Sequence, residues 1–133
     1  MKMDKLKEAL KLAEELGHIF VATADRKGLP HIAAAGKLTF NTKGLLALSA
    51  WFCPGTVANL SENRHIALVV WDAQKDMGFQ LLGEVKDMQE LDVLDGYAPA
   101  IEAKMRLPQV QRKLLIQVDT IIEFKHAPHS DIE

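Results

Sequence analysis

LALSAWFCPGTVANLSENRHIALVVWD, residues 46–72, is the stretch that constrains the fold most strongly. Its apolar ends predict two β-strands, and Pro-Gly followed by Thr56 predicts a short helix between them, at about residues 56–63. The free N–H groups in the first turn of such a helix, together with the positive end of its dipole, favour an anion. Gly55, Thr56 and Asn59 are therefore candidates for holding a phosphate, although most helices that begin in this way bind nothing.

Upstream of this stretch, apolar segments separated by short turns predict strands at about 18–25, 31–40 and 45–52. Gly28 and Gly44 lie in the turns, where a tight reversal favours glycine. Because the connections are short, we expect an antiparallel meander; a parallel sheet needs a helical crossover between strands.

A helix is predicted before these strands, where Asp4 can cap its start and Gly17 ends it. Apolar residues recur at helical spacing along it, namely Leu6, Ala9, Leu10, Ala13 and Leu16.

Downstream, the segment 78–88 is expected to pair with 65–73, and 114–125 is expected to form the last strand. Residues 89–105 have a helical pattern that Pro99 interrupts, and the final HAPHSDIE resembles a frayed tail. The predicted fold is mainly β (α+β): a six-stranded antiparallel Greek-key split β-barrel with helices covering its open ends. No linker or repeat divides the chain, so residues 1–133 are expected to form a single domain.

The composition excludes several classes of function. Sixteen basic and 18 acidic residues are scattered along the 133 positions, so neither a nucleic-acid groove nor an anionic membrane surface is indicated. No apolar run approaches the length of a membrane span. The single cysteine, Cys53, cannot form an intrachain disulfide, and no apolar segment of a signal peptide follows the charged start. A cytoplasmic location is therefore expected.

Histidine and cysteine side chains could bind a metal or haem, but their spacing here does not favour it. His126 and His129 are separated by Pro128, which prevents a regular helix, and no further ligand lies nearby in sequence, so no metal site is expected. His31 and His65 stand at the starts of strands and are expected at the surface. Cys53 is a redox thiol, a haem ligand or, more often for a lone cysteine, a small buried hydrophobe.

The order of these parts resembles the pyridoxamine 5'-phosphate oxidase-like family of FMN-binding split barrels. The resemblance rests on FVATADRKGLPHIAAAGKLTF (20–40), on the stretch 46–72, and on GFQLLGEV (78–85). These segments contain a Gly-x-Pro hairpin, a strand of small residues, a strand that ends at a Thr-x-x-Asn-Leu helix, and an apolar strand that ends in Asp. Each motif alone is common, and the resemblance depends on their order and spacing together.

This resemblance implies a homodimer with one FMN in each of two clefts at the subunit interface, bound by residues of both chains. It places Gly55, Thr56 and Asn59 at the FMN phosphate, and Gln80 on a strand whose polar side chain faces the flavin ring. The strands that border the ring would contribute small, polar and aromatic residues: Ala33, Ala34, Ala35, Ser49, Ala50, Trp51 and Phe52.

The resemblance further implies an FMN-dependent oxidoreductase or flavin reductase with a small-molecule electron donor or acceptor; no catalytic side chain is identified. Pyridoxamine phosphate oxidation itself is less expected, because the C-terminal segment offers few Arg and His residues for a second phosphate. The alternatives are a non-enzymatic flavin-binding electron carrier, a split barrel that binds a deazaflavin or haem, and a barrel with an empty cleft.

The chain departs from the family at Gly55, where many members carry Lys or Arg directly before the phosphate-contacting Thr. Lys37, Arg64 and Lys104 are candidates to replace the missing charge-assisted contact. Without such a replacement, either the affinity for FMN is lower or the cofactor differs. Thr56→Ala is expected to weaken FMN binding and to leave the fold largely intact, because one exposed cap typically contributes about 1 kcal/mol to stability.

Overall fold

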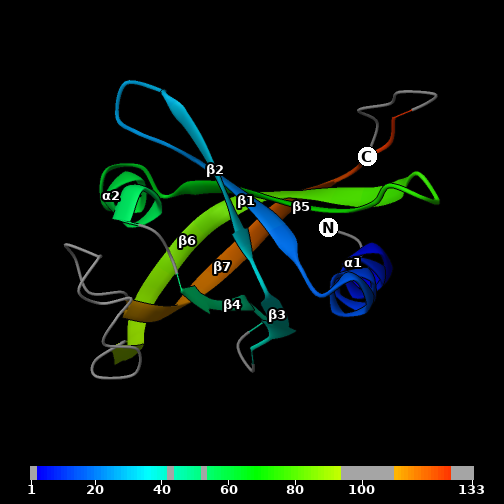
Figure 1. The fold of residues 1–133 in the computed structure, drawn as a ribbon, viewed down its shortest axis with the longest axis horizontal. Coiled ribbons are helices and arrows are strands. Elements are labelled where there is room, and N and C mark those ends of the chain that lie inside the picture. The colour runs from blue at the N-terminus through cyan, green and yellow to red at the C-terminus, as the bar shows by residue number, and fades with distance from the viewer. Residues whose placement is uncertain (1–2, 42–43, 52–53, 94–109, 127–133) are drawn as a thin grey trace, which may run out of the picture.

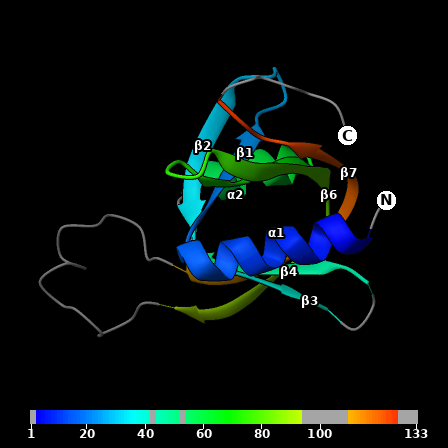
Figure 2. The same ribbon diagram turned by 90° about the vertical axis from the view of Figure 1, so that its right-hand side faces the viewer.

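A computed structural model of the protein describes residues 3–41, 44–51, 54–93 and 110–126 (Figures 1 and 2). In chain order its elements are α1 (Met3–Leu16), β1 (Ile19–Ala24), β2 (Pro30–Ala35), β3 (Lys37–Phe40), β4 (Leu46–Trp51), α2 (Pro54–Glu62), β5 (His65–Asp72), β6 (Met77–Val93) and β7 (Val110–Glu123).

The strands form one antiparallel seven-stranded sheet in the order β2-β1-β5-β6-β7-β4-β3. Figure 1 shows the long strands β6 and β7 curving together across the molecule. Their pairing contains register shifts at Leu82/Gly83, Val85/Asp87 and Glu90/Asp92, and such irregularities bend a sheet. The sheet is curled enough that β2 and β4 approach each other although they do not pair. The predicted split barrel is therefore confirmed, with seven strands in place of six.

The additional strand arises at Gly36, where the single strand predicted for residues 31–40 is divided into two. Before Gly36, β2 pairs with β1, from Ala24↔Pro30 to Ile19↔Ala35. After it, β3 pairs with β4. Both antiparallel pairings expected of the meander are therefore confirmed, but the middle strand is not continuous, because β2 and β3 lie at opposite ends of the sheet order. The apolar pattern continues through Gly36 because both strands cover the same core, and it therefore did not reveal the change of partner.

The helix predicted for residues 89–105 is wrong over its first five residues. Residues 89–93 belong to β6, where Gln89 pairs with Lys113 and Val93 with Val110. Pairing with β7 overrides the helical propensity of this polar segment. Residues 94–105 lie outside the described part of the chain. The last strand begins at Val110, four positions before the predicted start at Leu114.

The helix α1 covers one end of the barrel, as predicted, and contacts β3, β5 and β6. It begins at Met3, so Asp4 lies in its first turn and does not precede it. Gly17 has a φ of 77° and donates its N–H to Ala13 O at 2.9 Å, which confirms the predicted C-cap. The side chains that α1 buries against the core are apolar: Leu6, Ala9, Leu12 and Ala13.

The helix α2 lies away from α1 and packs on β1 and β2 (Figure 1). It begins at Pro54, two residues before its predicted start. Its last turn is tied to its neighbours, because Glu62 Oε2 accepts the N–H of Arg26 at 3.2 Å and Asn63 Oδ1 accepts that of His65 at 3.1 Å. The C-terminal end of α2 is therefore anchored against the β1–β2 turn, which contains Arg26.

Candidate functional site

Polar side chains are buried where α2 meets the sheet. In the described ranges, the buried polar residues are Thr23 of β1, 4% exposed, and Thr56 of α2, 0% exposed. Asn59 donates from Nδ2 to Thr23 Oγ1 at 3.1 Å, and Thr56 Oγ1 lies 3.4 Å from His31 Nδ1. Buried polar groups need partners, and here each contact joins α2 to β1 or β2. Two predicted phosphate residues, Thr56 and Asn59, are thus brought together at one helix–sheet junction.

The third predicted phosphate residue, Gly55, is exposed and lies directly against His31. A Cβ added to Gly55 would be 3.2 Å from His31 Nε2 and 3.5 Å from His31 Cδ2. That approach is closer than ordinary van der Waals contact. A side chain at residue 55 would therefore require the imidazole of His31 to shift by a few tenths of an ångström.

This junction fits an anion through its backbone as well as its side chains. The first N–H groups of a helix have no partner within the helix, and Gly55 exposes the backbone at that turn. An imidazole N–H beside the same turn is a further hydrogen-bond donor. The residues present are thus compatible with the phosphate of a flavin nucleotide, provided that a histidine takes the place of the usual lysine or arginine.

The alanines predicted to border the flavin do not present a single face. Ala35 is buried and Ala33 half-buried, whereas Ala34 is exposed, as expected for alternation along a strand. Ala34 shares its side of the sheet with Phe20, its pairing partner, and with Val69, which pairs with Phe20. Only alternate alanines can therefore lie against any one ligand surface.

Gln80 lies on that same outer face of the sheet, where it pairs with Val69 and Ile122. Thr56 and Asn59 contact the opposite face, because their partners His31 and Thr23 alternate with the outward-facing Ile32 and Ala22. Within one chain, Gln80 and the α2 junction are therefore not brought together.

Ser49 is half-buried on β4 and pairs with Lys37 on β3 and with Lys113 on β7. The backbones of Ala50 and Trp51 continue β4 and pair with Arg112 and Gln111. The strand ends at Trp51, three positions before α2 begins at Pro54. Phe52 and Cys53 lie outside the described part of the chain.

The three predicted substitutes for a cation at residue 55 differ in their placement. Lys37 is exposed on β3, beside Ser49 and not beside Gly55. Arg64 donates from Nη1 to Val85 O at 3.2 Å, which holds it against β6. Lys104 lies outside the described residues. The residue that does lie beside Gly55 is His31, which was expected at the surface.

His31 was missed because its sequence position gives no indication of its neighbour. It is separated from Thr56 by 25 positions. The alternation in PHIAAA shows only that His31, Ala33 and Ala35 share a side of the strand. It does not show that α2 packs on this side of β2 and brings Thr56 to His31. His65, by contrast, is exposed, as predicted.

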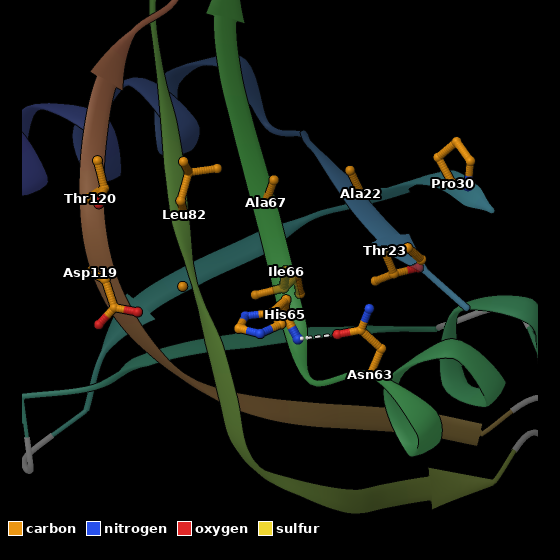
Figure 3. A pocket seen from close by; sticks show the side chains of 12 residues that line it. Ala22, Thr23, Pro30, Asn63, His65, Ile66, Ala67, Leu82, Asp119 and Thr120 are labelled. Carbon is orange, nitrogen blue, oxygen red and sulfur yellow. Dashed lines mark hydrogen bonds between the residues drawn. The ribbon is translucent and has the colours of Figure 1, made fainter. Parts of the chain in front are cut away.

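A groove of about 460 Å³ opens beside the junction, where the ends of several strands meet (Figure 3). Ala22, Ala67 and Leu82 line it from three adjacent strands, and their register places them in one row across the sheet. Asp119 and Thr120 line it from β7. Thr23, which accepts the hydrogen bond from Asn59, also lines the groove and so connects it with the α2 junction.

No group of three or more His, Cys, Asp or Glu side chains is arranged to hold a metal ion among the residues placed by the structure. In the same part of the chain, neither helix is both long and apolar enough to cross a membrane.

Comparison with known proteins gives a family match and related folds. Residues 4–121 match the family model described as pyridoxamine 5'-phosphate oxidase. An uncharacterized protein of Methanocaldococcus jannaschii is 29% identical over 128 residues, covering 93% of this chain and 84% of that protein.

Solved structures with low sequence identity share the fold. An FMN-binding protein of Syntrophomonas wolfei has a TM-score of 0.58 at 17% identity, covering 88% of this chain and 86% of that one. An F420 reductase has a TM-score of 0.58 at 15% identity, covering 84% and 93%. HutZ, the heme storage protein of Vibrio cholerae, has a TM-score of 0.57 at 13% identity, covering 92% and 94%.

Proposed function

The chain belongs to the pyridoxamine 5'-phosphate oxidase family, and from this premise we propose that it is a flavoprotein that binds FMN and acts as an oxidoreductase or flavin reductase. The observation that carries the proposal is the α2 junction, where exposed Gly55, buried Thr56 and His31 surround the first turn of a helix. This is the position that the family resemblance gives to the FMN phosphate. A fold match with an FMN-binding protein supports the same cofactor.

In this proposal the protein binds and orients the flavin, and the flavin supplies hydride or electron transfer when bound. The first turn of α2 and His31 hold the phosphate, while the junction between Asn59 and Thr23 keeps α2 fixed on the sheet. The flavin ring lies along β2 and the end of β4, beside Ser49 and alternate alanines. A small-molecule electron donor, such as a reduced nicotinamide, would approach the ring from the open side of the cleft.

The proposal includes a homodimer formed through the outer face of the sheet. Ile32 is 69% exposed and Phe20 is 40% exposed on this face. Each of these residues lies in a row of apolar side chains that crosses several strands. The row that contains Ile32 continues through Ala22 and Ala67. Extended apolar surface of this kind usually contacts another protein. A second chain on this face would also bring Gln80 of one subunit toward a flavin held by the other, which a single chain does not do.

The assembly can be tested with two matched variants. Ile32→Asp is expected to shift the protein toward monomer, because it buries a charge in the proposed interface. Leu29→Asp is the control, since Leu29 is equally exposed at 69% but lies in the β1–β2 turn. Light scattering after size-exclusion chromatography measures both masses. A monomeric unaltered protein, or equal effects of the two variants, would contradict this interface.

The cofactor is tested by the absorption spectrum of the purified protein, followed by titration with FMN while flavin fluorescence is measured. Two flavin bands, or saturable quenching at one FMN per chain, are expected. Turnover of a reduced nicotinamide would then identify an enzyme. A protein that binds FMN but exchanges electrons only with a partner protein would be the alternative, a non-enzymatic electron carrier.

Haem is the second candidate cofactor, because the heme storage protein HutZ shares the fold over 92% of this chain. A Soret band in the same spectrum would replace the FMN proposal by haem binding. A deazaflavin is the third, given the fold match with an F420 reductase, and its titration would follow a negative FMN result.

We also propose a cytoplasmic location. The single cysteine in 133 residues is compatible with a reducing compartment.

A further inference from the structure

We propose that His31 is the specificity-determining residue for the flavin phosphate, taking the place of the basic side chain that Gly55 lacks. This inference rests on the proposed FMN site and names the side chain that would discriminate FMN from riboflavin at that site. It also couples residue 55 to His31, because a side chain at residue 55 would press against the imidazole.

The geometry places the imidazole against the first turn of α2. His31 Nε2, Cδ2 and Cε1 lie 3.2, 3.5 and 3.7 Å from the position of a Cβ on Gly55. On its other side, His31 Nδ1 lies 3.4 Å from Thr56 Oγ1. The ring is thus in contact with two successive residues of the turn. Its backbone is held by pairing with Thr23 in β1, next to Pro30, so the ring projects from a fixed strand.

The chemistry of this pair directs a donor toward the turn. A threonine hydroxyl can donate to Nδ1, and a neutral imidazole that accepts at Nδ1 carries its proton on Nε2. Nε2 is the ring nitrogen nearest to the Cβ position of residue 55. With Thr56 Oγ1 as the donor to Nδ1, a phosphate at the exposed backbone of Gly55 would meet the Nε2–H of the imidazole. Thr56, which is fully buried, would act through His31 as a positioning residue.

The first experiment measures the affinities of FMN and riboflavin by fluorescence quenching, because only FMN carries the phosphate. His31→Ala is expected to reduce the ratio of FMN affinity to riboflavin affinity about tenfold, the usual effect of one hydrogen bond to a charged group. His31→Gln, which keeps a donor, should reduce the ratio less and covers the case in which the alanine variant folds poorly. His126→Ala is the matched control, since His126 lies near the β5–β6 turn, where its backbone N–H donates to Asp76 Oδ1 at 2.6 Å.

A second experiment tests the shared space without any ligand. Gly55→Ala should lower the melting temperature when His31 is present, because the new Cβ would crowd the ring. In the His31→Ala background the same change should have little effect or raise the melting temperature, since alanine is the better helix former. The difference between the two backgrounds is the coupling between residues 55 and 31.

The outcomes separate this inference from the proposed function. An unaltered protein that does not bind FMN would overturn the proposed function, and this inference with it. FMN binding with an affinity ratio that His31→Ala and His31→Gln leave unchanged would overturn the inference alone. Equal effects of Gly55→Ala in the two backgrounds would show that His31 does not occupy the space of residue 55, and would overturn it as well.

Discussion

The two helices cover different parts of the same barrel, and they do so with different chemistry. The helix α1 buries only apolar side chains, and Leu6, Ala9, Leu12 and Ala13 are each no more than 4% exposed. The helix α2 buries the apolar Leu60 but also buries Thr56 completely, and polar contacts join it to His31 and Thr23. Apolar packing stabilises a fold without specifying chemistry, whereas buried polar contacts fix particular atoms in place.

This difference explains why the candidate site lies at α2. At α1, replacing a buried side chain changes only how well the core is packed. Other apolar residues of similar volume could therefore take its place. At α2 each polar group needs its own partner, so the junction between Thr56, His31, Asn59 and Thr23 constrains sequence much more tightly. We therefore expect substitutions at α1 to change stability alone, and substitutions at α2 to change both stability and flavin binding.

The largest loss of stability is expected for Leu6→Ala. Leu6 is 1% exposed in the core, and truncation of a buried leucine costs about 3 kcal/mol. Urea denaturation measures the change, and FMN affinity of the folded protein should remain within about twofold. A clear loss of FMN affinity at unchanged stability would remove the distinction between the two helices.

A smaller loss is expected for Thr56→Ala, about 2 kcal/mol, because both packing volume and a buried hydroxyl are lost. This corrects the expectation from the sequence, which treated Thr56 as an exposed cap, whereas its side chain is 0% exposed. Thr56→Ser keeps the hydroxyl and should retain most FMN affinity, as measured by fluorescence titration. An alanine variant as stable as the unaltered protein would show that this junction contributes little to the fold.

Asn59→Ala should cost about 1 kcal/mol, since it removes the donor to buried Thr23. The control is Ser61→Ala on the same helix, where an exposed hydroxyl donates to Val57 O at 3.0 Å and its loss should cost less than about 0.5 kcal/mol. Thermal denaturation of the pair compares a helix–sheet contact with a contact inside the helix. Equal costs would mean that α2 is held by its apolar side chains.

The smallest effect is expected for Lys86→Ala on β6. Its Nζ lies 3.5 Å from Glu84 Oε2. The side chain of Lys86 is 44% exposed and that of Glu84 is 40% exposed. An exposed pair of this kind contributes less than about 0.5 kcal/mol and is screened by salt. Denaturation at low and high salt should give nearly the same stability for the variant and the unaltered protein. A loss above 1 kcal/mol would indicate a role for this strand that the contacts do not reveal.

The sequence predicted most of the elements because each has a strong local signal. The helical repeat of Leu6, Ala9 and Ala13 predicted α1, and Gly17 predicted its end. Alternating apolar residues predicted β1 and β5, and Pro-Gly predicted the start of α2 within two residues. The prediction failed at Gly36, where a strand changes partner, and at residues 89–93, where distant pairing outweighs local propensity.

By itself, the sequence determined the family, the strand and helix inventory in outline, and Gly55, Thr56 and Asn59 as the residues of the turn. These follow from local periodicity and from short motifs, which depend on neighbours in the chain. Only the tertiary structure decided that Thr56 is buried and that His31 lies beside Gly55. It also decided that Gln80 faces the other side of the sheet. The physical reason is that the curled sheet brings together positions far apart in the chain, and no local pattern encodes which side chains then meet.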